Sequence, residues 1–460
     1  MFLYNYLSRQ KEAFKPFNKG KKVSLYTCGP TVYDYAHIGN LRTFIFEDVL
    51  RRSLKHEGYQ VFQVMNLTDV DDKIIKRASS EGVGIDVVTS RYAEAFFNDI
   101  KELNIEKAEV YPRATAHIKE MIDLISLLMK KKLAYQGKDH SIYFNIAKFK
   151  NYGRLSGINK RKLKIGARVE ADEYSKNDAT DFVLWKANKP GEPFWKSPWG
   201  YGRPGWHIEC SAMSMKYLGP TFDIHTGAVD LVFPHHENEI AQSEGATGKK
   251  FARVWIEGEH VLIDGKKMSK SLKNFFTLAD LKTKGISPLS FRYLTLGTQY
   301  RKKLNFTWKS LRSAEKSLNN LMAILNKEPT VVDKSKYDKE YSSKAVIKYW
   351  RDFSDAISDD LNTPKALSVL WAVAGDKKLS LSHRRELVKN FDIVFGLGLI
   401  RPKPTKKVIP DEINKLVAER ESLRVHKQFI QADALRVKIE SLGYRLEDTE
   451  KGPRVTHGKN

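Results

Sequence analysis

Apolar positions in the first part of the chain follow two different periods. The segment KKVSLYTCGP places Val23, Leu25 and Tyr26 before a Cys-Gly-Pro turn and predicts a short buried strand. From about Ala36 to His56 apolar residues recur at steps of three and four, which predicts a helix. YQVFQVMNLT predicts a second strand. Strand, helix and strand in this order favour a parallel sheet.

The later segments predict an insertion and a helical C-terminal part. Residues 141–205 are irregular and rich in Gly, Pro and Lys. TFDIHTG then predicts a strand, and PHHENEIAQSEGATG predicts a helix with Pro234 in its first turn. From about Thr307 the pattern is helical, and RPKPTKKVIP (401–410) interrupts it as a predicted linker.

Composition narrows the class of protein. At about 150 residues per domain, 460 residues suggest about three domains. Two cysteines argue against an extracellular disulfide scaffold, no apolar run approaches the roughly 20 residues that span a bilayer, and the N-terminus lacks a signal layout. The 79 basic residues against 55 acidic ones give +24, which favours a polyanionic partner, with nucleic acid ahead of a membrane. A basic surface kept for solubility is the alternative.

Two segments have the composition of phosphate sites. PTVYDYAHIGNLRTF lies where the first strand meets its helix, and unpaired N–H groups at a helix start attract phosphate. His37 can donate to phosphate oxygens, and Gly39 lets a flat base approach the backbone. GKKMSKSLKN (265–274) is a Lys-Ser loop that can close on a triphosphate. Alone, the first favours a capping or core histidine and the second a solvated surface. Together and in this order they resemble the signature of class I aminoacyl-tRNA synthetases.

A third set of residues suits a metal ion. Cys28 ends the first strand, Cys210 lies in GWHIECSAMS, and His235 and Glu239 stand four apart on one helix face. Two thiolates, an imidazole and a carboxylate make a plausible tetrahedral Zn²⁺ set. For an arbitrary pair of cysteines, inert buried residues and a polar helix face are the favoured alternative.

Nearly the whole chain resembles the cysteinyl-tRNA synthetases. The matching stretches are YTCGPTVYDYAHIGN, LTDVDDKIIKRA, TDFVLWK, GRPGWHIECSAMS, FPHHENEIAQSE and KMSKS. The resemblance implies Cys28, Cys210, His235 and Glu239 as zinc ligands, with His236 beside them as a non-ligand. It also implies an α/β fold: a Rossmann-like parallel-sheet catalytic domain with an inserted subdomain, then an α-helical bundle and a small C-terminal module.

The resemblance assigns the remaining site residues. It places His37 and Asn40 at the phosphates, Lys267 and Lys270 at the departing pyrophosphate, and Gly39, Gly227, Asp230 and Lys270 at ATP. The substrate-pocket positions are Tyr26, Gly29, Thr68 and Trp206, although Tyr26 and Trp206 suit core aromatics equally well. The acidic DVDD (69–72) could be a Mg²⁺ site, but a helix N-terminus is favoured.

Three positions depart from the family pattern. Asn40 stands where a second histidine is usual, and it keeps a donor but cannot be protonated. Ala228 and Val229 interrupt the usual glycine-rich run before Asp230, which puts the approach of the adenine in question. Lys273 replaces a glycine after KMSKS.

The distribution of charge suggests a tRNA surface. Residues 251–330 hold 15 Lys+Arg and 6 Asp+Glu, and Arg301, Lys302 and Lys303 form the densest basic run, expected to meet backbone phosphate. HKQFIQADALR resembles the family's anticodon-reading module. There Phe429 could stack on a base while Asp433, Arg436 and Asp448 bond base edges, with a solvated helix face as the alternative.

We therefore expect a cytoplasmic cysteine–tRNA ligase. It would be a monomer without membrane association, with one Zn²⁺ per chain, ATP with Mg²⁺, L-cysteine and tRNA(Cys). The expected divisions are catalytic halves 1–135 and 205–258 around an insertion 136–204, a KMSKS and stem-contact region 259–310, a helical bundle 311–400 and an anticodon module 401–460. A ligase joining cysteine to an amino-sugar is one rival, which the FIQADALR segment argues against. A catalytically dead tRNA-binding regulator is another, which the intact motifs argue against.

Overall fold

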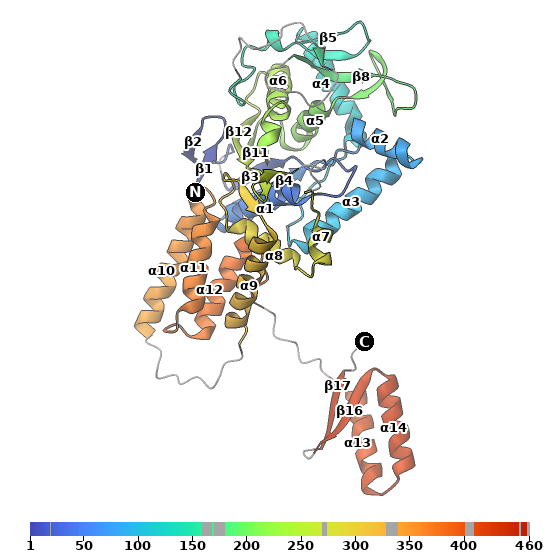
Figure 1. Cartoon of the computed structure of the whole chain (residues 1–460), viewed down its shortest axis with the longest axis vertical. Coiled ribbons are helices and arrows are strands. Elements are labelled where there is room, and N and C mark those ends of the chain that lie inside the picture. Colours follow the sequence, from blue (N-terminus) through green and yellow to red (C-terminus); the bar gives the residue numbers. More distant parts are fainter. Residues whose placement is uncertain are drawn as a thin grey trace. The chain divides into compact units, whose positions relative to one another are not determined.

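The chain forms two compact units, residues 1–400 and 401–460 (Figure 1). The computed structural model describes residues 1–18, 20–158, 168–169, 180–268, 274–327, 339–400, 409–449 and 452–457. Each unit is described by itself. Since the first unit is not divided further, the predicted subdivision within residues 1–400 stays a prediction.

A four-stranded parallel sheet forms the centre of the first unit, as the sequence predicts. Its strands are ordered β12 (Ala252–Gly258), β11 (Phe222–Ala228), β3 (Lys22–Thr27) and β4 (Gln60–Met65). Helix α1 (Ile38–His56) connects β3 to β4 and buries most of its length, so the βαβ unit predicted from periodicity is confirmed. The fold class is therefore confirmed as α/β.

Further helices and a second sheet surround this core. The helices are α2 (Asp72–Glu81), α3 (Ile85–Glu102), α4 (Ile118–Lys130), α5 (Trp206–Leu218) and α6 (His235–Thr247), with short 3-10 turns at Ala114–His117, Ile146–Lys148 and Val229–Val232. The second sheet is antiparallel along the order β5 (Ala134–Gln136), β6 (Ile142–Phe144), β8 (Asp181–Ala187), β10 (Gly200–Pro204) and β9 (Trp195–Ser197), with β7 (Arg168–Val169) beside β8. An N-terminal hairpin comprises β1 (Phe2–Asn5) and β2 (Gln10–Ala13).

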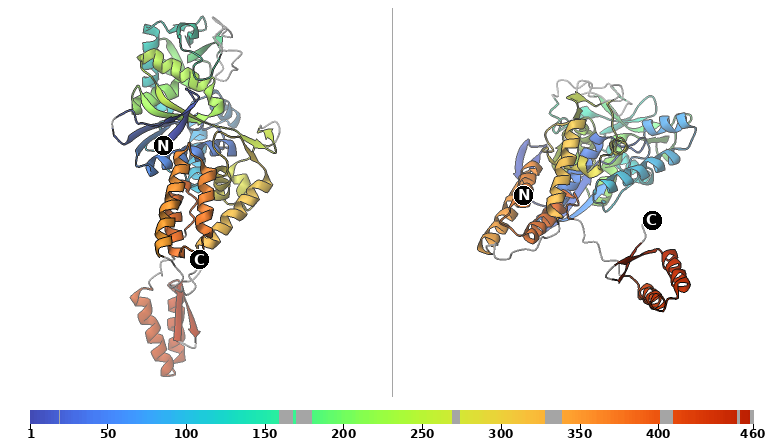
Figure 2. Two further views of the ribbon diagram at one scale, coloured as in Figure 1. Left: turned by 90° about the vertical axis from the view of Figure 1, so that its left-hand side faces the viewer. Right: turned by 60° about the horizontal axis from the view of Figure 1, so that its bottom comes forward.

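The rest of the first unit is mainly helical. After β13 (Val261–Ile263), β14 (Lys266–Lys267), α7 (Leu278–Thr283), α8 (Pro288–Leu296) and β15 (Leu304–Phe306), four helices run side by side in a bundle (Figures 1 and 2). They are α9 (Trp308–Leu325), α10 (Lys339–Ser358), α11 (Thr363–Gly375) and α12 (Leu381–Phe395). The predicted helix start at Thr307 is correct, because its side chain caps α9 by accepting from the Ser310 N–H.

Buried charges fasten α1 to this bundle. The Asp48 carboxylate on α1 pairs with Arg52 and with the fully buried Arg292 of α8. Arg292 also donates to the carbonyl of Phe395 at the end of α12. Because removing either partner of a buried pair leaves an uncompensated charge, this cluster fixes the bundle against the helix that follows β3.

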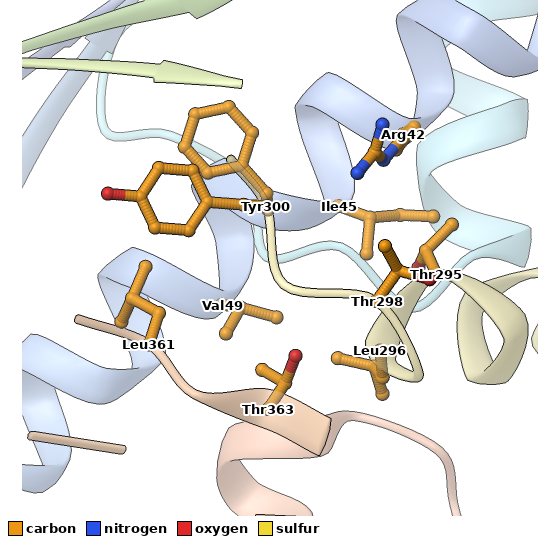
Figure 3. Close-up of a pocket in the computed structure, with 10 residues that line it drawn as sticks. Arg42, Ile45, Val49, Thr295, Leu296, Thr298, Tyr300, Leu361 and Thr363 are labelled. Atoms are coloured by element: carbon orange, nitrogen blue, oxygen red, sulfur yellow. The ribbon is translucent and has the colours of Figure 1, made fainter. Parts of the chain in front are cut away.

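A small cavity lies beside that junction. Ile45 and Val49 of α1 face Leu361 and Thr363 of the bundle across it, with Tyr300 at one side (Figure 3). Apolar side chains and threonines line it, and it lies between α1 and the start of α11.

The second unit is a helical hairpin with a small sheet. Helices α13 (Asp411–Val425) and α14 (Phe429–Ser441) precede the antiparallel strands β16 (Tyr444–Thr449) and β17 (Gly452–His457). Its core consists of Ile413, Val417, Ile439 and Leu446. Across the described residues of both units, we find no helix with the length and apolar character needed to cross a membrane.

Candidate active site

A cleft opens at the carboxyl ends of β3 and β11. Residues that follow β3 line one side, and Ala228, Asp230 and Trp206 line another, around a cavity of about 260 Å³. In open parallel sheets this edge is where ligands bind. A cavity of this size is close to the lower end of small-molecule sites, which span about 300–1,000 Å³.

The structure brings the two phosphate-type motifs together. His37 forms a backbone bridge with Thr277, and the Ile38 N–H donates to the Phe276 carbonyl at 2.8 Å. A Cβ on Gly39 would stand 2.8 Å from Met268 Cε, so only glycine permits this approach without a shift. The segments before and after the KMSKS serines therefore pack on the start of α1. Lys270 itself lies outside the described residues, as does Lys273.

His37 is the N-cap of α1. Its Nδ1 accepts a hydrogen bond from the Asn40 N–H at 3.1 Å, and Asn40 Oδ1 accepts from the His37 N–H at 3.3 Å. Because Nδ1 accepts, the proton of a neutral imidazole lies on Nε2, which is the donor. The capping role and the phosphate role are thus compatible, since they use different ring nitrogens. The side-chain NH₂ of Asn40 makes no hydrogen bond within the described part of the chain.

The four predicted metal ligands converge. Cys28 follows β3, Cys210 lies on α5, and His235 and Glu239 occupy successive turns of α6. One donor atom from each lies within 4.8 Å of the others, and all four side chains are buried. His235 Nε2 is 3.0 Å from Glu239 Oε1. Two sulfurs, one nitrogen and one oxygen in a space of this size fit a tetrahedral Zn²⁺ ion.

The pKa shifts in this cluster favour anionic side chains that can bind a cation. Burial alone would raise the pKa of the Cys210 thiol. A hydrogen bond with Cys28 and the charge of His235 outweigh this effect and lower that pKa to about 6. Burial, Cys210 and Glu239 raise the pKa of the Cys28 thiol. Glu239 is fully buried, yet His225 and His235 hold its pKa well below the ordinary value. The cluster thus holds one ready thiolate and one carboxylate, the anionic ligands that a metal requires.

A second donor set shares two of these residues. Cys28 and Glu239 also lie within 4.8 Å of His225 and His236. His236 Nε2 is 3.5 Å from Cys28 Sγ, while its Nδ1 is 2.9 Å from Glu257 Oε1. His225 Nε2 is 2.8 Å from Glu239 Oε2. The first set contains two cysteines and the second contains one. Because thiolate ligands favour Zn²⁺, the set with two cysteines suits Zn²⁺ better.

Sequence reasoning missed His225 and Glu257 and left His236 without a role. The available signal was a polar residue on an otherwise apolar parallel strand: His225 on β11 and Glu257 on β12 are both buried. Such residues need partners inside the fold, and here the partners are Glu239 and His236.

The predicted substrate-pocket residues occupy two depths. Gly29 and Trp206 line the cleft, and the Trp206 ring stacks on His235 with 4.1 Å between centroids. A Cβ on Gly29 would meet the Asn66 carbonyl at 1.7 Å, so the position requires glycine. Thr68 lies one layer deeper, and Tyr26 is fully buried against His225. Burial and the two thiols raise the pKa of Tyr26, which stays neutral beside the candidate metal ligands.

The predicted ATP residues differ in exposure. Asp230 is exposed and lines the cleft, where its carboxylate can accept from a ribose. Gly227 is buried, and a Cβ there would meet the His236 ring at 2.7 Å. The packing of His236 is therefore a second reason for glycine at position 227. Lys267 is exposed on β14.

The acidic run 69–72 is engaged by the fold. Asp71 caps α2, Asp69 accepts from the Thr115 N–H and hydroxyl, and Asp72 pairs with the buried Lys186 and with Arg203. Three carboxylates with separate partners support the helix-start interpretation over a magnesium site.

The predicted tRNA contacts are placed in different settings. Arg301 is paired with Asp360 at 2.7 Å and lies over the Tyr4 ring, whereas Lys302 and Lys303 are exposed. In the second unit Phe429 is 57% exposed and Asp433 is exposed. Arg436 pairs with Glu440, and Asp448 with Arg420. Lys302, Lys303, Phe429 and Asp433 are thus open to a partner, whereas Arg301 and Asp448 also stabilise the fold.

Known proteins resemble this chain along its whole length. Residues 14–316 match the family model for the tRNA synthetases class I (C) catalytic domain. The cysteine–tRNA ligase of Chlamydia abortus is 45% identical, with 99% of this chain and 97% of that protein covered. That of Brachyspira hyodysenteriae is 45% identical, with 98% of each covered.

Solved structures support the same fold at low identity. Methionyl-tRNA synthetase of Mycobacterium tuberculosis, in complex with methionyl-adenylate, aligns with a TM-score of 0.58 and 14% identity over 82% of this chain and 90% of that one. A leucyl-tRNA synthetase of Agrobacterium radiobacter K84 aligns with a TM-score of 0.60 and 10% identity over 84% and 85%. With the identities to the ligases, the family-model match and the converged motifs, this chain belongs to the cysteine–tRNA ligase family of class I aminoacyl-tRNA synthetases.

Proposed function

We propose that the chain activates L-cysteine with ATP and Mg²⁺ and transfers the cysteinyl group to tRNA(Cys), with Zn²⁺ in the Cys28 cluster selecting the substrate thiol. The observation that carries the proposal is the convergence of Cys28, Cys210, His235 and Glu239 at one end of a cleft whose other end holds His37 and the KMSKS flank. We expect a cytoplasmic monomer.

The metal explains how cysteine is separated from serine. The two differ by one atom, and a pocket discriminates by about 1–3 kcal/mol for such a small group. When bound, Zn²⁺ supplies a soft Lewis acid that holds the substrate sulfur and has little affinity for a hydroxyl. The chain contributes the anionic ligands, and Trp206, which lines the cleft, stacks on His235. No editing domain is then needed.

The other end of the cleft carries the phosphate chemistry. The ionised carboxylate of cysteine attacks the α-phosphate, which requires no general base, so orientation and charge neutralisation supply the acceleration. His37 Nε2 and the Asn40 amide donate to phosphate oxygens, Lys267 with Lys270 neutralises the leaving pyrophosphate, and Asp230 accepts from the ribose. The 2′-hydroxyl of the terminal adenosine of tRNA then attacks the carbonyl carbon of the cysteinyl-adenylate, so an ester to tRNA forms and AMP leaves.

Cysteine-dependent exchange of pyrophosphate into ATP, followed by charging of tRNA(Cys), tests the proposal. Exchange with cysteine but not serine, followed by charging, is expected. Absence of exchange with zinc-loaded protein would contradict activation. Exchange without charging would instead favour the ligase that joins cysteine to an amino-sugar.

A further inference from the structure

One wall of the cleft has no part in the activation of cysteine described above. The loop that follows β3 contributes Tyr33 and Tyr35 to it, α2 contributes Lys73, and α3 contributes Tyr92. The rings of Tyr35 and Tyr92 meet edge to face with 5.2 Å between centroids, and Lys73 Nζ lies 5.8 Å from the centroid of the Tyr33 ring. We call these four residues the aromatic wall, since they combine exposed ring surface with a cation.

Tyr35 and Lys73 are the members of the aromatic wall that a partner can reach most easily. The side chain of Tyr35 is 51% exposed, whereas the other described aromatic residues that line the cleft are buried or half-buried. Lys73 is exposed as well, and among the described residues of the cleft lining it is the one lysine or arginine. An aromatic face and a long cation thus stand open at the same rim.

The support behind Tyr35 is fixed before a partner arrives. Tyr92 is buried, and its hydroxyl accepts a hydrogen bond from Arg77 of α2 at 2.6 Å. Glu81 accepts from Arg77 and, at 2.8 Å, from Arg91 of α3. These contacts join α2 to α3 beneath the ring of Tyr35, so little further ordering is needed when a flat group stacks there.

Aromatic rings beside a cation are the usual means of binding unpaired nucleotides. Bases stack on the rings, and the cation meets the backbone phosphate. ATP also carries a base, but its ribose is assigned to Asp230 on another side of the cleft. Of the remaining substrates, cysteine has no base and tRNA has an unpaired 3′ end. That end must reach a cysteinyl-adenylate held between the metal cluster and the start of α1, and the aromatic wall is the side left open to it.

We propose that the aromatic wall binds the unpaired 3′ end of tRNA(Cys), with Tyr35 stacked on a base and Lys73 paired with a backbone phosphate. The inference rests on the proposed function and deepens it, because it assigns the side from which the RNA strand enters. Stacking and a phosphate contact carry little sequence information. The aromatic wall therefore positions the strand, so that its terminal 2′-hydroxyl reaches the adenylate, and leaves the choice of tRNA to other surfaces.

The test measures the Kd of the zinc-loaded, full-length protein for tRNA(Cys) and for the same tRNA shortened to its last base pair. The unmodified protein should bind the complete tRNA more tightly. Tyr35→Ala should weaken binding of the complete tRNA by at least about fivefold, the lower value for one base stack, and leave that of the shortened tRNA unchanged. Tyr35→Phe keeps the ring and should behave like the unmodified protein. Equal Kd values of the unmodified protein for the two RNAs, or an equal loss for both in Tyr35→Ala, would overturn the inference.

The phosphate contact has a test of its own. Lys73→Met should reduce the slope of log Kd against log salt concentration by about 0.7 for the complete tRNA, the value for one phosphate of a single strand, and not for the shortened one. Lys76→Met is the matched control, because Lys76 is also exposed on α2 but does not line the cleft. An unchanged slope in Lys73→Met, or the same selective change in Lys76→Met, would contradict the assignment of Lys73.

Tyr201→Ala is the matched control for the ring. Tyr201 is 57% exposed and meets Phe194 edge to face with 5.3 Å between centroids, but it does not line the cleft. Its variant should keep the preference for the complete tRNA, and a loss equal to that of Tyr35→Ala would mean that any exposed tyrosine gives this effect.

Pyrophosphate exchange without tRNA separates the strand from the nucleotide. If the KM for ATP rises in Tyr35→Ala as much as the Kd for the complete tRNA, the ring binds the adenine of ATP and the inference is wrong. Failure of the proposed function is distinguishable, because the unmodified protein would then show no cysteine-dependent exchange or no charging of tRNA(Cys).

Discussion

The two ends of the cleft are built in opposite ways. At the thiol end every predicted metal ligand is buried, and His236 contacts Cys28 while His225 contacts Glu239. At the phosphate end Asn40, Asp230 and Lys267 are exposed, and His37 is the N-cap of α1. Selection between nearly identical side chains requires ligands that are fixed and dry before the substrate arrives. Phosphate chemistry requires charges that can follow a departing group.

The largest expected effect is on metal binding at the buried end. Cys210→Ser should weaken zinc binding well beyond the ~10–100-fold that loss of an outer contact costs, because it removes a ligand itself. Metal content by mass spectrometry after dialysis measures this.

His236→Gln distinguishes the two donor sets. His236 belongs only to the set without Cys210, so this variant should still bind about one ion per chain at saturating zinc. Zinc retained by Cys210→Ser but lost from His236→Gln would assign the ion to the other set.

The exposed end should show the reverse behaviour. Lys267→Ala should slow pyrophosphate exchange by ~100-fold or more, since it removes a charge that acts on the leaving group, while zinc content stays constant. Lys266 is the matched control, because neighbours on a strand point to opposite sides. An equal loss in Lys266→Ala would mean that general basicity, not a defined contact, matters there.

The C-terminal unit adds a third, weaker dependence. Phe429→Ala should reduce tRNA charging by ~10–100-fold through the KM for tRNA, the effect of one base stack, and leave cysteine activation unchanged. Ile430→Ala is the control, because this side chain is 89% exposed but has no aromatic face. Equal losses in the two variants would argue for apolar contact instead of stacking.

Acid should disturb the buried end in a graded way. The folded-state pKa of Cys210 is lowered to about 6, so its thiolate stabilises the metal-free fold above the ordinary thiol pKa, and this contribution is lost as pH falls through about 6. Thiolate absorbance of metal-free protein should change with a midpoint near pH 6, and zinc affinity should fall about tenfold per unit below it. A midpoint near 9 would show that the cluster does not activate Cys210.

The spacing of apolar residues was sufficient to predict the strands and helices that bury one face. Strand β3, helix α1 and strand β4 follow the predicted segments, because apolar spacing decides burial there. The helix after Pro234 begins at His235, with the proline one position earlier than predicted, as the N-cap. The ligand set Cys28, Cys210, His235 and Glu239 was predicted from the family resemblance, because the residue types alone made it only plausible.

The supporting contacts depend on tertiary packing, which one sequence does not encode locally. The pairing of His225 with Glu239 joins β11 to α6, and that of Arg292 with Asp48 joins α8 to α1. Arg301 belongs to a basic run that was predicted to contact phosphate. In the structure its side chain pairs with Asp360, 59 residues later in the chain. A count of basic residues therefore overestimates the positive charge that is available to bind RNA.

The most direct test is whether a metal ion in the buried cluster coordinates the sulfur of the substrate. The protein loaded with Co²⁺ in place of Zn²⁺ would be titrated with L-cysteine and, separately, with L-serine, while thiolate-to-cobalt absorption is recorded. We predict an increase with cysteine and none with serine, and no increase in Cys210→Ser. No response to cysteine, or an equal response to serine, would contradict the claim that a metal held by Cys28, Cys210, His235 and Glu239 selects the substrate.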